Sequence, residues 1–330
     1  INQTPFYGES GGQTGDTGSA YNDKTQIDIT SSSKPIQELI THKAKITQGT
    51  LKKSDTLTLK VNAQIRSETA LHHTATHLLH AALKKILGEH VKQAGSLVTS
   101  ERLRFDYTHF SPLSIMEKSN IEKMINEKIR ENLTVLTCEQ PIEQAVQEGA
   151  MALFGEKYGS TVRVVSMGIF SKELCGGTHT SATGNIGLFK IISEGSIASG
   201  IRRIEAIAGK SAYISMQSEN VTLSSIRNLL KVSPEEELYR IKKILEKSRE
   251  MEKEISLLKE KLISGKEVDL ENDIEIAGDI SFLVKQFDGM DAKTLRSFID
   301  SSKNKMKSGI VVVGSNSDGK VLLAAGVTKN

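Results

Sequence analysis

The sequence predicts an α+β protein made of four successive parts, and changes of pattern along the chain define them. Residues 1–62 are rich in Gly, Ser and Thr and contain short alternating strands. Residues 63–208 mix amphipathic helices with strand-like runs, residues 209–266 are helical, and residues 267–330 alternate between strand and helix patterns. We therefore expect a small β-barrel, an α+β domain, a helical hairpin or coiled coil, and a partial α/β C-terminal module.

The bulk composition predicts a multidomain protein with neither a membrane span nor a disulfide framework. A chain of 330 residues with 38% hydrophobic residues can bury several cores. No run approaches the roughly 20 apolar residues that cross a bilayer, and the first residues lack the pattern of a secretion signal. Only Cys138 and Cys175 are present, which favours a reducing cytoplasm, and we expect Cys138 to be an inert core thiol.

The net charge and the chain ends say less about function. A formal charge of +3 permits contact with nucleic acid but does not by itself indicate it. The chain starts at Ile1 without an initiator methionine and stops abruptly at Asn330. We therefore expect a fragment of a longer polypeptide.

Helical periodicity is clearest in residues 67–88, where Gly88 supplies the stop, and a second helix is expected over about 112–132, opened by Ser111 and Pro112. A third helix over about 210–231 leads to Ser233, which can cap the next helix with Glu236 completing a capping box. In that next helix, apolar residues recur alternately three and four positions apart, with one serine among them, which predicts a coiled-coil seam against the preceding helix. The seam residues are Ile241, Ile244, Ser248, Met251, Ile255, Leu258 and Leu262.

A metal site is predicted by two pairs of side chains. His73 and His77 are four apart on the first helix, so both rings can reach one ion. Far downstream, Cys175 and His179 offer a thiolate and an imidazole, and the two glycines between them let the backbone fold closely. Three imidazoles and one thiolate suit zinc better than magnesium or calcium. We therefore predict one Zn²⁺ ion bound by these four residues.

The neighbouring histidines are competing candidates. His72 lies about 100° around the helix from His73, whereas His80 shares the ligand face and can support a ligand or face a substrate. Thr74 stands where the HExxH motif of zinc peptidases has its glutamate, which disfavours a peptidase.

Together these motifs resemble the editing domain of alanyl-tRNA synthetase, a lineage that includes free-standing alanyl-tRNA deacylases. The resemblance spans nearly the whole chain, including the helical hairpin and the terminal module. It rests on five segments in family order: Thr4 to Gly18, His73 to His77, Gln93 to Val98, Cys175 to His179, and Gly200 to Glu205.

The resemblance implies hydrolysis of the ester that joins serine or glycine to tRNA(Ala), with the aminoacylated 3′ end of that tRNA as partner. Such editing is needed because one missing methyl group is worth only about 1–3 kcal/mol of discrimination. No aminoacylation domain is encoded in these residues, so we expect no charging of tRNA. The resemblance also implies a cytoplasmic protein and raises a homodimer through the C-terminal region.

Roles for individual residues follow from the same resemblance. Four protein ligands would close a tetrahedron, and Gln93 is then the candidate to hold the attacking water. Adjacent arginines on a strand face opposite ways, so at most one of Arg202 and Arg203 can meet the tRNA phosphates. Thr4 or Gln13 is the candidate to hydrogen-bond a serine hydroxyl. All the candidate substrate-binding residues are Thr4, Gln13, Asp16, Gly176, Thr178 and Arg202.

Two alternatives remain open from the sequence. The editing domain of threonyl-tRNA synthetase shares both halves of the metal motif, although the glycine-rich start and the helical hairpin argue against it. The other alternative is a non-catalytic module in which zinc is structural and the chain binds tRNA or dimerises.

Overall fold

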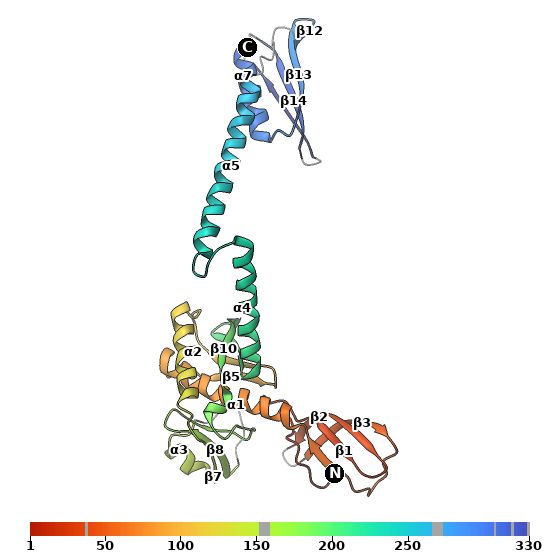
Figure 1. Cartoon of the computed structure of the whole chain (residues 1–330), viewed down its shortest axis with the longest axis vertical. Coiled ribbons are helices and arrows are strands. Elements are labelled where there is room, and N and C mark those ends of the chain that lie inside the picture. The colour runs from red at the N-terminus through yellow and green to blue at the C-terminus, as the bar shows by residue number, and fades with distance from the viewer. Residues whose placement is uncertain (37–38, 152–158, 266–272, 307, 318–319, 329–330) are drawn as a thin grey trace. The chain divides into compact units, whose positions relative to one another are not determined.

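The computed structural model describes residues 1–330 except for 37–38, 152–158, 266–272, 307, 318–319 and 329–330. The chain divides into two compact units, Ile1–Thr222 and Leu223–Asn330 (Figure 1). Helices and several separate sheets confirm the α+β class. The finer division into four domains stays a prediction. In the described part of the chain, no helix is both long and apolar enough to cross a membrane.

The N-terminal strands form an open antiparallel sheet, so the predicted barrel is wrong. The sheet has the order β3-β2-β1-β4, and no pairing among the described residues joins β3 to β4. Two of its four strands have only four residues, and its core is small: Phe6, Ala20, Ile27 and Ile29. The strands are β1 Gly18–Tyr21, β2 Gln26–Ile36, β3 Leu39–Gln48 and β4 Thr58–Val61.

The largest core lies where two helices pack on a second sheet, of order β10-β11-β6-β5. The helices are α1 Ala63–Leu87 and α2 Ile115–Arg130, and the strands are β5 Gln93–Val98, β6 Leu103–Thr108, β10 Phe189–Ala198 and β11 Ile201–Ala208. Asn62 caps α1. The second helix begins later than expected because Ser114, not Ser111, forms a capping box with Glu117.

A third sheet carries one half of the predicted metal site. Its order is β7-β8-β9, with strands β7 Val135–Pro141, β8 Thr161–Met167 and β9 Ser171–Leu174, accompanied by α3 Ile142–Gln147 and the 3₁₀ helix η1 Thr183–Ile186. Cys138 lies on β7 and is exposed, so the expectation of a core thiol is wrong. A lone cysteine on a strand carries no local signal of which face the protein covers.

The helices that follow are α4 Lys210–Leu230 and α5 Glu237–Gly265. Ser233 donates its backbone N–H to Glu236, but α5 starts only at Glu237 because Glu235 adopts a positive φ of 76° that no helix allows. The apolar members of the predicted seam with described side chains are exposed: Ile241, Ile244, Met251, Ile255 and Leu258. The pairing of this seam with the preceding helix stays a prediction.

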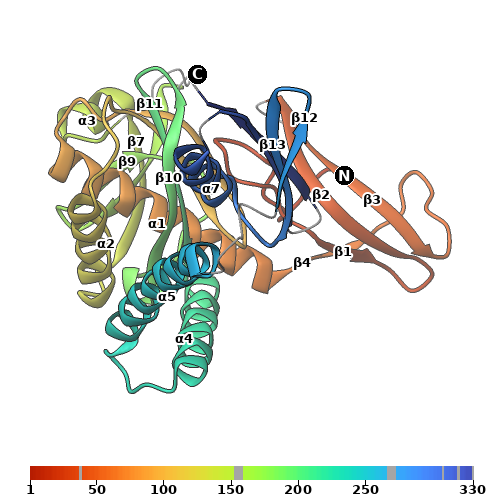
Figure 2. The ribbon, with the colours of Figure 1, turned by 90° about the horizontal axis from the view of Figure 1, so that it is seen from above.

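The C-terminal sheet has the order β12-β13-β14-β15, and α7 packs against β14 and β15 (Figure 2). β13 and β14 are parallel, with α7 as their crossover. The elements are β12 Ile274–Ala277, β13 Ile280–Asp288, α7 Ala292–Lys305, β14 Ile310–Ser317 and β15 Lys320–Val327. The sequence pattern of this part, which is strand, helix, strand, turn and strand, predicts a single strand at its start, where the structure has the hairpin of β12 and β13. The turn that the pattern predicts at 316–319 lies partly outside the described residues.

The core against α2 can be tested with two isoleucines of that helix. Ile125 is fully buried, whereas Ile115 is 89% exposed. Ile125→Ala should lower the free energy of unfolding by about 2–5 kcal/mol through lost burial and a residual cavity. The matched control Ile115→Ala should change it by less than about 0.5 kcal/mol. Urea unfolding with zinc present measures both, and equal effects would contradict this packing.

Candidate metal centre

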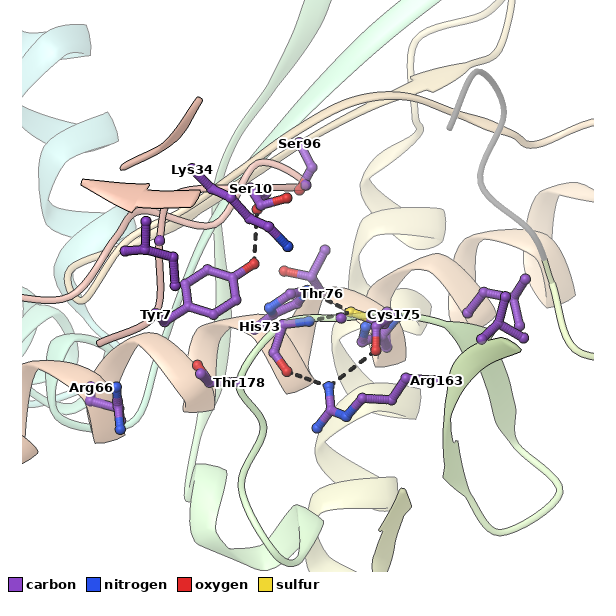
Figure 3. A pocket seen from close by; sticks show the side chains of 18 of the residues that line it. Tyr7, Ser10, Lys34, Arg66, His73, Thr76, Ser96, Arg163, Cys175 and Thr178 are labelled. Atoms are coloured by element: carbon purple, nitrogen blue, oxygen red, sulfur yellow. Dashed lines mark hydrogen bonds between the residues drawn. The ribbon is translucent and has the colours of Figure 1, made fainter. Parts of the chain in front are cut away.

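The structure brings the four predicted ligands together. His73 and His77 lie one turn apart on α1, Cys175 directly follows β9, and His179 comes four residues later. One donor atom from each of the four lies within 4.8 Å of the others. The Cys175 sulfur is 3.3 Å from Nε2 of His73 (Figure 3). It is also 3.3 Å from Nε2 of His179.

Hydrogen bonds on the far side of each ring determine which nitrogen faces the cluster. His77 Nδ1 lies 2.7 Å from a carboxylate oxygen of Glu173, which can only accept, so this nitrogen carries the proton. His179 Nδ1 lies 3.2 Å from the Thr74 hydroxyl, whose own proton goes to the carbonyl of Ala70. His179 is therefore also protonated on Nδ1.

His73 follows the same rule through an amide. Its Nδ1 lies 2.7 Å from Gln13 Oε1, and the backbone N–H of Thr178 donates to that same oxygen at 2.9 Å. An N–H can only donate, so the amide orientation is fixed and His73 must donate from Nδ1. All three imidazoles thus direct the lone pair of Nε2 toward the cluster.

The donor set fits a zinc ion. His77 Nε2 is buried and has no hydrogen-bond partner among the described residues, which is costly unless another group binds it. Once the three imidazoles have lost the proton from Nε2, their lone pairs and the thiolate form a tetrahedral set that zinc accepts. Burial raises the pKa of the Cys175 thiol, but His73, His77 and His179 outweigh burial and hold that pKa well below its usual range. The thiolate that a metal requires is therefore favoured.

Glu173 supports two histidines at once. Its carboxylate is 1% exposed and accepts from Nδ1 of His77 and, at 3.2 Å, from Nδ1 of His80. Burial alone would raise its pKa, but the charge and hydrogen bonds of both histidines outweigh burial and lower that pKa well below the ordinary value. Carboxylates placed as that of Glu173 is orient metal-binding histidines. His80 shares this carboxylate with His77 and is thus a supporting residue, which is one of the two roles expected for it.

Gly177 is required by close packing against a ligand ring. A Cβ atom on Gly177 would lie 2.1 Å from His73 Cε1 and 2.8 Å from Gln13 Oε1. Gly176 has open space at the same position, with nothing within 4 Å. Arg163 fixes this loop by donating to the carbonyl oxygens of Cys175, at 3.0 Å, and Gly177, at 2.5 Å (Figure 3).

A cavity of about 570 Å³ opens beside the ligands. Besides three of the ligands, three other predicted site residues line it, namely Gln93, Gly176 and Thr178, and so do Thr76 and Ser96. Among the described residues that line it, no side chain is a carboxylate and three carry a permanent positive charge: Lys34, Arg66 and Arg163. The cavity therefore favours an anionic or polar ligand.

The other predicted substrate residues do not line this cavity. Thr4 accepts locally from the backbone N–H of Phe6. Asp16 is buried, where it accepts from the backbone of Tyr7 and forms an ion pair with Arg66. Gln13 lies behind His73, with its amide engaged by His73 and Thr178.

The two adjacent arginines face opposite ways, as expected for a strand, yet both are already paired. Arg202 is 7% exposed and forms an ion pair with the buried Glu194. Arg203 binds both carboxylate oxygens of Asp106, at 2.7 and 2.9 Å. Neither lines the cavity, so this structure gives no support to the phosphate contact expected of Arg202.

His72 is a satisfied core histidine. It is 1% exposed, its Nδ1 lies 2.9 Å from the carbonyl of Glu68, and its Nε2 accepts from the backbone N–H of Ala208 at 3.0 Å. The sequence argument that separated it from His73 by its position around the helix is confirmed.

Sequence reasoning missed Glu173 and Arg163. The available signal for Glu173 was an acidic residue two positions before Cys175, next to Leu174 in a short strand. Arg163 carried no signal because its partners are backbone carbonyls contributed by a distant loop.

Two family models each match a part of the chain. The second additional domain of threonyl and alanyl tRNA synthetases matches residues 162–205, which include Cys175 and His179. The class II (A) tRNA synthetase model matches residues 1–65, which include Gln13. The chain therefore contains segments typical of a class II tRNA synthetase with an editing-type domain.

Relatives that match over the whole length of this chain give a more specific comparison. An alanine–tRNA ligase of Desulfosudis oleivorans is 46% identical over 99% of this chain and 37% of the ligase. Those of Saccharophagus degradans and Shewanella amazonensis are 47% and 45% identical over the whole chain and 38% of each ligase. The chain is thus homologous along its length to alanine–tRNA ligases, of which it spans little more than a third. This confirms the resemblance and favours it over the threonyl alternative.

The packing of Gly177 gives a matched test of the metal centre. Gly177→Ala should displace the His73 ring and weaken zinc affinity about 10- to 100-fold, the range found when support of a metal ligand is lost. Gly176→Ala should leave the affinity within about twofold, because a methyl group meets nothing there. Competition with a chromophoric chelator measures both, and equal affinities for the two variants would refute the close approach.

Proposed function

We propose that this chain hydrolyses the ester bond of mischarged tRNA(Ala), removing serine or glycine from its 3′ end. The observation that carries the proposal is that the candidate metal centre opens on a cavity that also contains uncharged hydrogen-bonding groups. The homology to alanine–tRNA ligases supports the choice of tRNA.

The positive charge of Lys34 at the cavity supports the end of a nucleic acid as the ligand. Arg66 is neutralised by Asp16, and Arg163 is engaged with backbone carbonyls. Lys34 is exposed at the cavity, where its ammonium group can meet a phosphate (Figure 3).

The chain's own residues divide the work of ester hydrolysis. A zinc ion held by the four ligands would polarise the ester carbonyl or lower the pKa of a water. Gln93 lines the cavity and can hold an attacking water through its amide. Thr76 donates its hydroxyl to the carbonyl of His72 at 2.8 Å, so its oxygen lone pairs remain for a substrate hydroxyl or ammonium group.

The alternative of a purely structural zinc site has one observation in its favour. Four protein ligands complete a tetrahedron, and closed sites of this kind are usually structural. The cavity next to the ligands favours the catalytic proposal, and the assay below decides between the two.

Deacylation of seryl-tRNA(Ala) should require the ligand cluster. His77→Ala or Cys175→Ala should reduce the rate at least about 100-fold, since metal polarisation is worth several kcal/mol, and a chelator should act likewise. His90→Ala is the control, because His90 is an exposed histidine that pairs with His109. Alanyl-tRNA(Ala) should stay intact throughout. Unchanged seryl ester with a zinc-loaded, folded chain would establish the structural alternative.

The phosphate contact of Lys34 should appear in substrate binding. Lys34→Gln should raise KM roughly three- to tenfold with little change in kcat, and should lower the salt dependence by about one phosphate contact. Lys45→Gln is the control, since Lys45 is exposed on β3 outside the cavity lining and pairs across the sheet with Asp28. Steady-state kinetics from about 50 to 200 mM salt give both quantities. Identical salt slopes for the two variants would exclude the contact.

A further inference from the structure

We infer that Gln13 is a positioning residue for His73, so that the glycine-rich N-terminal loop completes the metal centre. Sequence reasoning had assigned Gln13 to a substrate hydroxyl. The inference rests on the ligand cluster alone and does not require the chain to be a deacylase.

The contacts of Gln13 place it directly behind a metal ligand. Its side chain is 1% exposed, and Oε1 accepts from His73 Nδ1 at 2.7 Å and from the backbone N–H of Thr178 at 2.9 Å. Its Nε2 donates to the Thr178 hydroxyl at 2.9 Å. One amide therefore orients a ligand on α1 and holds the loop between Cys175 and His179.

This contact fixes the tautomer of His73. With Oε1 as acceptor, the proton must reside on Nδ1, and Nε2 presents its lone pair to the cluster, 3.3 Å from the Cys175 sulfur. His77 and His179 receive the equivalent support from Glu173 and Thr74. Without Gln13, His73 would be the one ligand histidine of the three with no acceptor for Nδ1.

Contacts with β5 hold the N-terminal loop in the position that brings Gln13 to His73. Gln13 and Thr14 lie beside β5, where Thr14 donates its N–H to the carbonyl of Val98 at 3.0 Å. Gly12 has a φ of +81°, and a Cβ there would lie 2.5 Å from the Ser96 carbonyl oxygen. Gly12 thus lets the loop approach the backbone of β5 closely, and Gln13 thereby reaches His73.

The consequence is that the metal site combines residues from two segments of the chain that match different family models. Gln13 lies in residues 1–65, which match the class II (A) synthetase model, whereas Cys175 and His179 lie in residues 162–205, which match the second additional domain. His73 lies between them and contacts both.

Zinc affinity and cobalt spectroscopy test the inference without any tRNA. Gln13→Ala should weaken zinc binding about 10- to 100-fold. It should also change the visible ligand-field bands of the Co²⁺-substituted chain, because His73 is no longer held in place. Gln13→Glu should restore most of both properties, since a carboxylate oxygen can accept from His73 and Thr178. Gln48→Ala, at an exposed glutamine on β3, is the control and should behave as the unmodified chain.

A double-mutant comparison separates positioning from a general structural role. If Gln13 acts through His73, Gln13→Ala should weaken zinc binding by less than about twofold in a His73→Ala background. A loss of equal size in both backgrounds, or an unchanged affinity and cobalt spectrum in Gln13→Ala alone, would overturn the inference. Either result leaves the deacylation proposal standing, because that proposal depends on the ligands themselves.

Discussion

Three imidazoles can direct Nε2 toward one point only when each Nδ1 is held elsewhere, and this constraint organises the whole metal centre. The acceptors are of three different kinds: the amide of Gln13, the carboxylate of Glu173 and the hydroxyl of Thr74. They come from the N-terminal loop, from β9 and from α1 itself. The packing of these three elements is therefore also the geometry of the ligand set.

The ligands were predictable from sequence because helical spacing and a short glycine-rich loop each specify local geometry. His73 and His77 follow from the period of α1, and Cys175 and His179 from two glycines between them. Their supports were not predictable in the same way. Gln13 and His73 are 60 positions apart, so nothing in local spacing brings them together.

Other expectations also depended on contacts between elements that are distant in sequence. Strand alternation in residues 1–62 predicts a small β-barrel, but closure depends on which edge strands meet, and no pairing among the described residues joins β3 to β4. Arg202 was expected at a phosphate because an arginine on a strand gives no sign of its partner, and Glu194 takes that place. Cys138 shows that a thiol in an alternating strand is assigned to a face only by the neighbouring elements.

The long separation of the two ligand pairs has a consequence for folding. Cys175 lies 102 positions after His73, and α2 together with β5, β6, β7 and β8 is contained in the interval. An ion bound to both pairs acts as a cross-link that closes this loop and reduces the conformational entropy of the unfolded chain. A covalent bridge across a loop of that size is worth about 4–5 kcal/mol in the simplest polymer model. Metal occupancy is in this sense a topological constraint on two sheets, β10-β11-β6-β5 and β7-β8-β9, and not only a local property of one cavity.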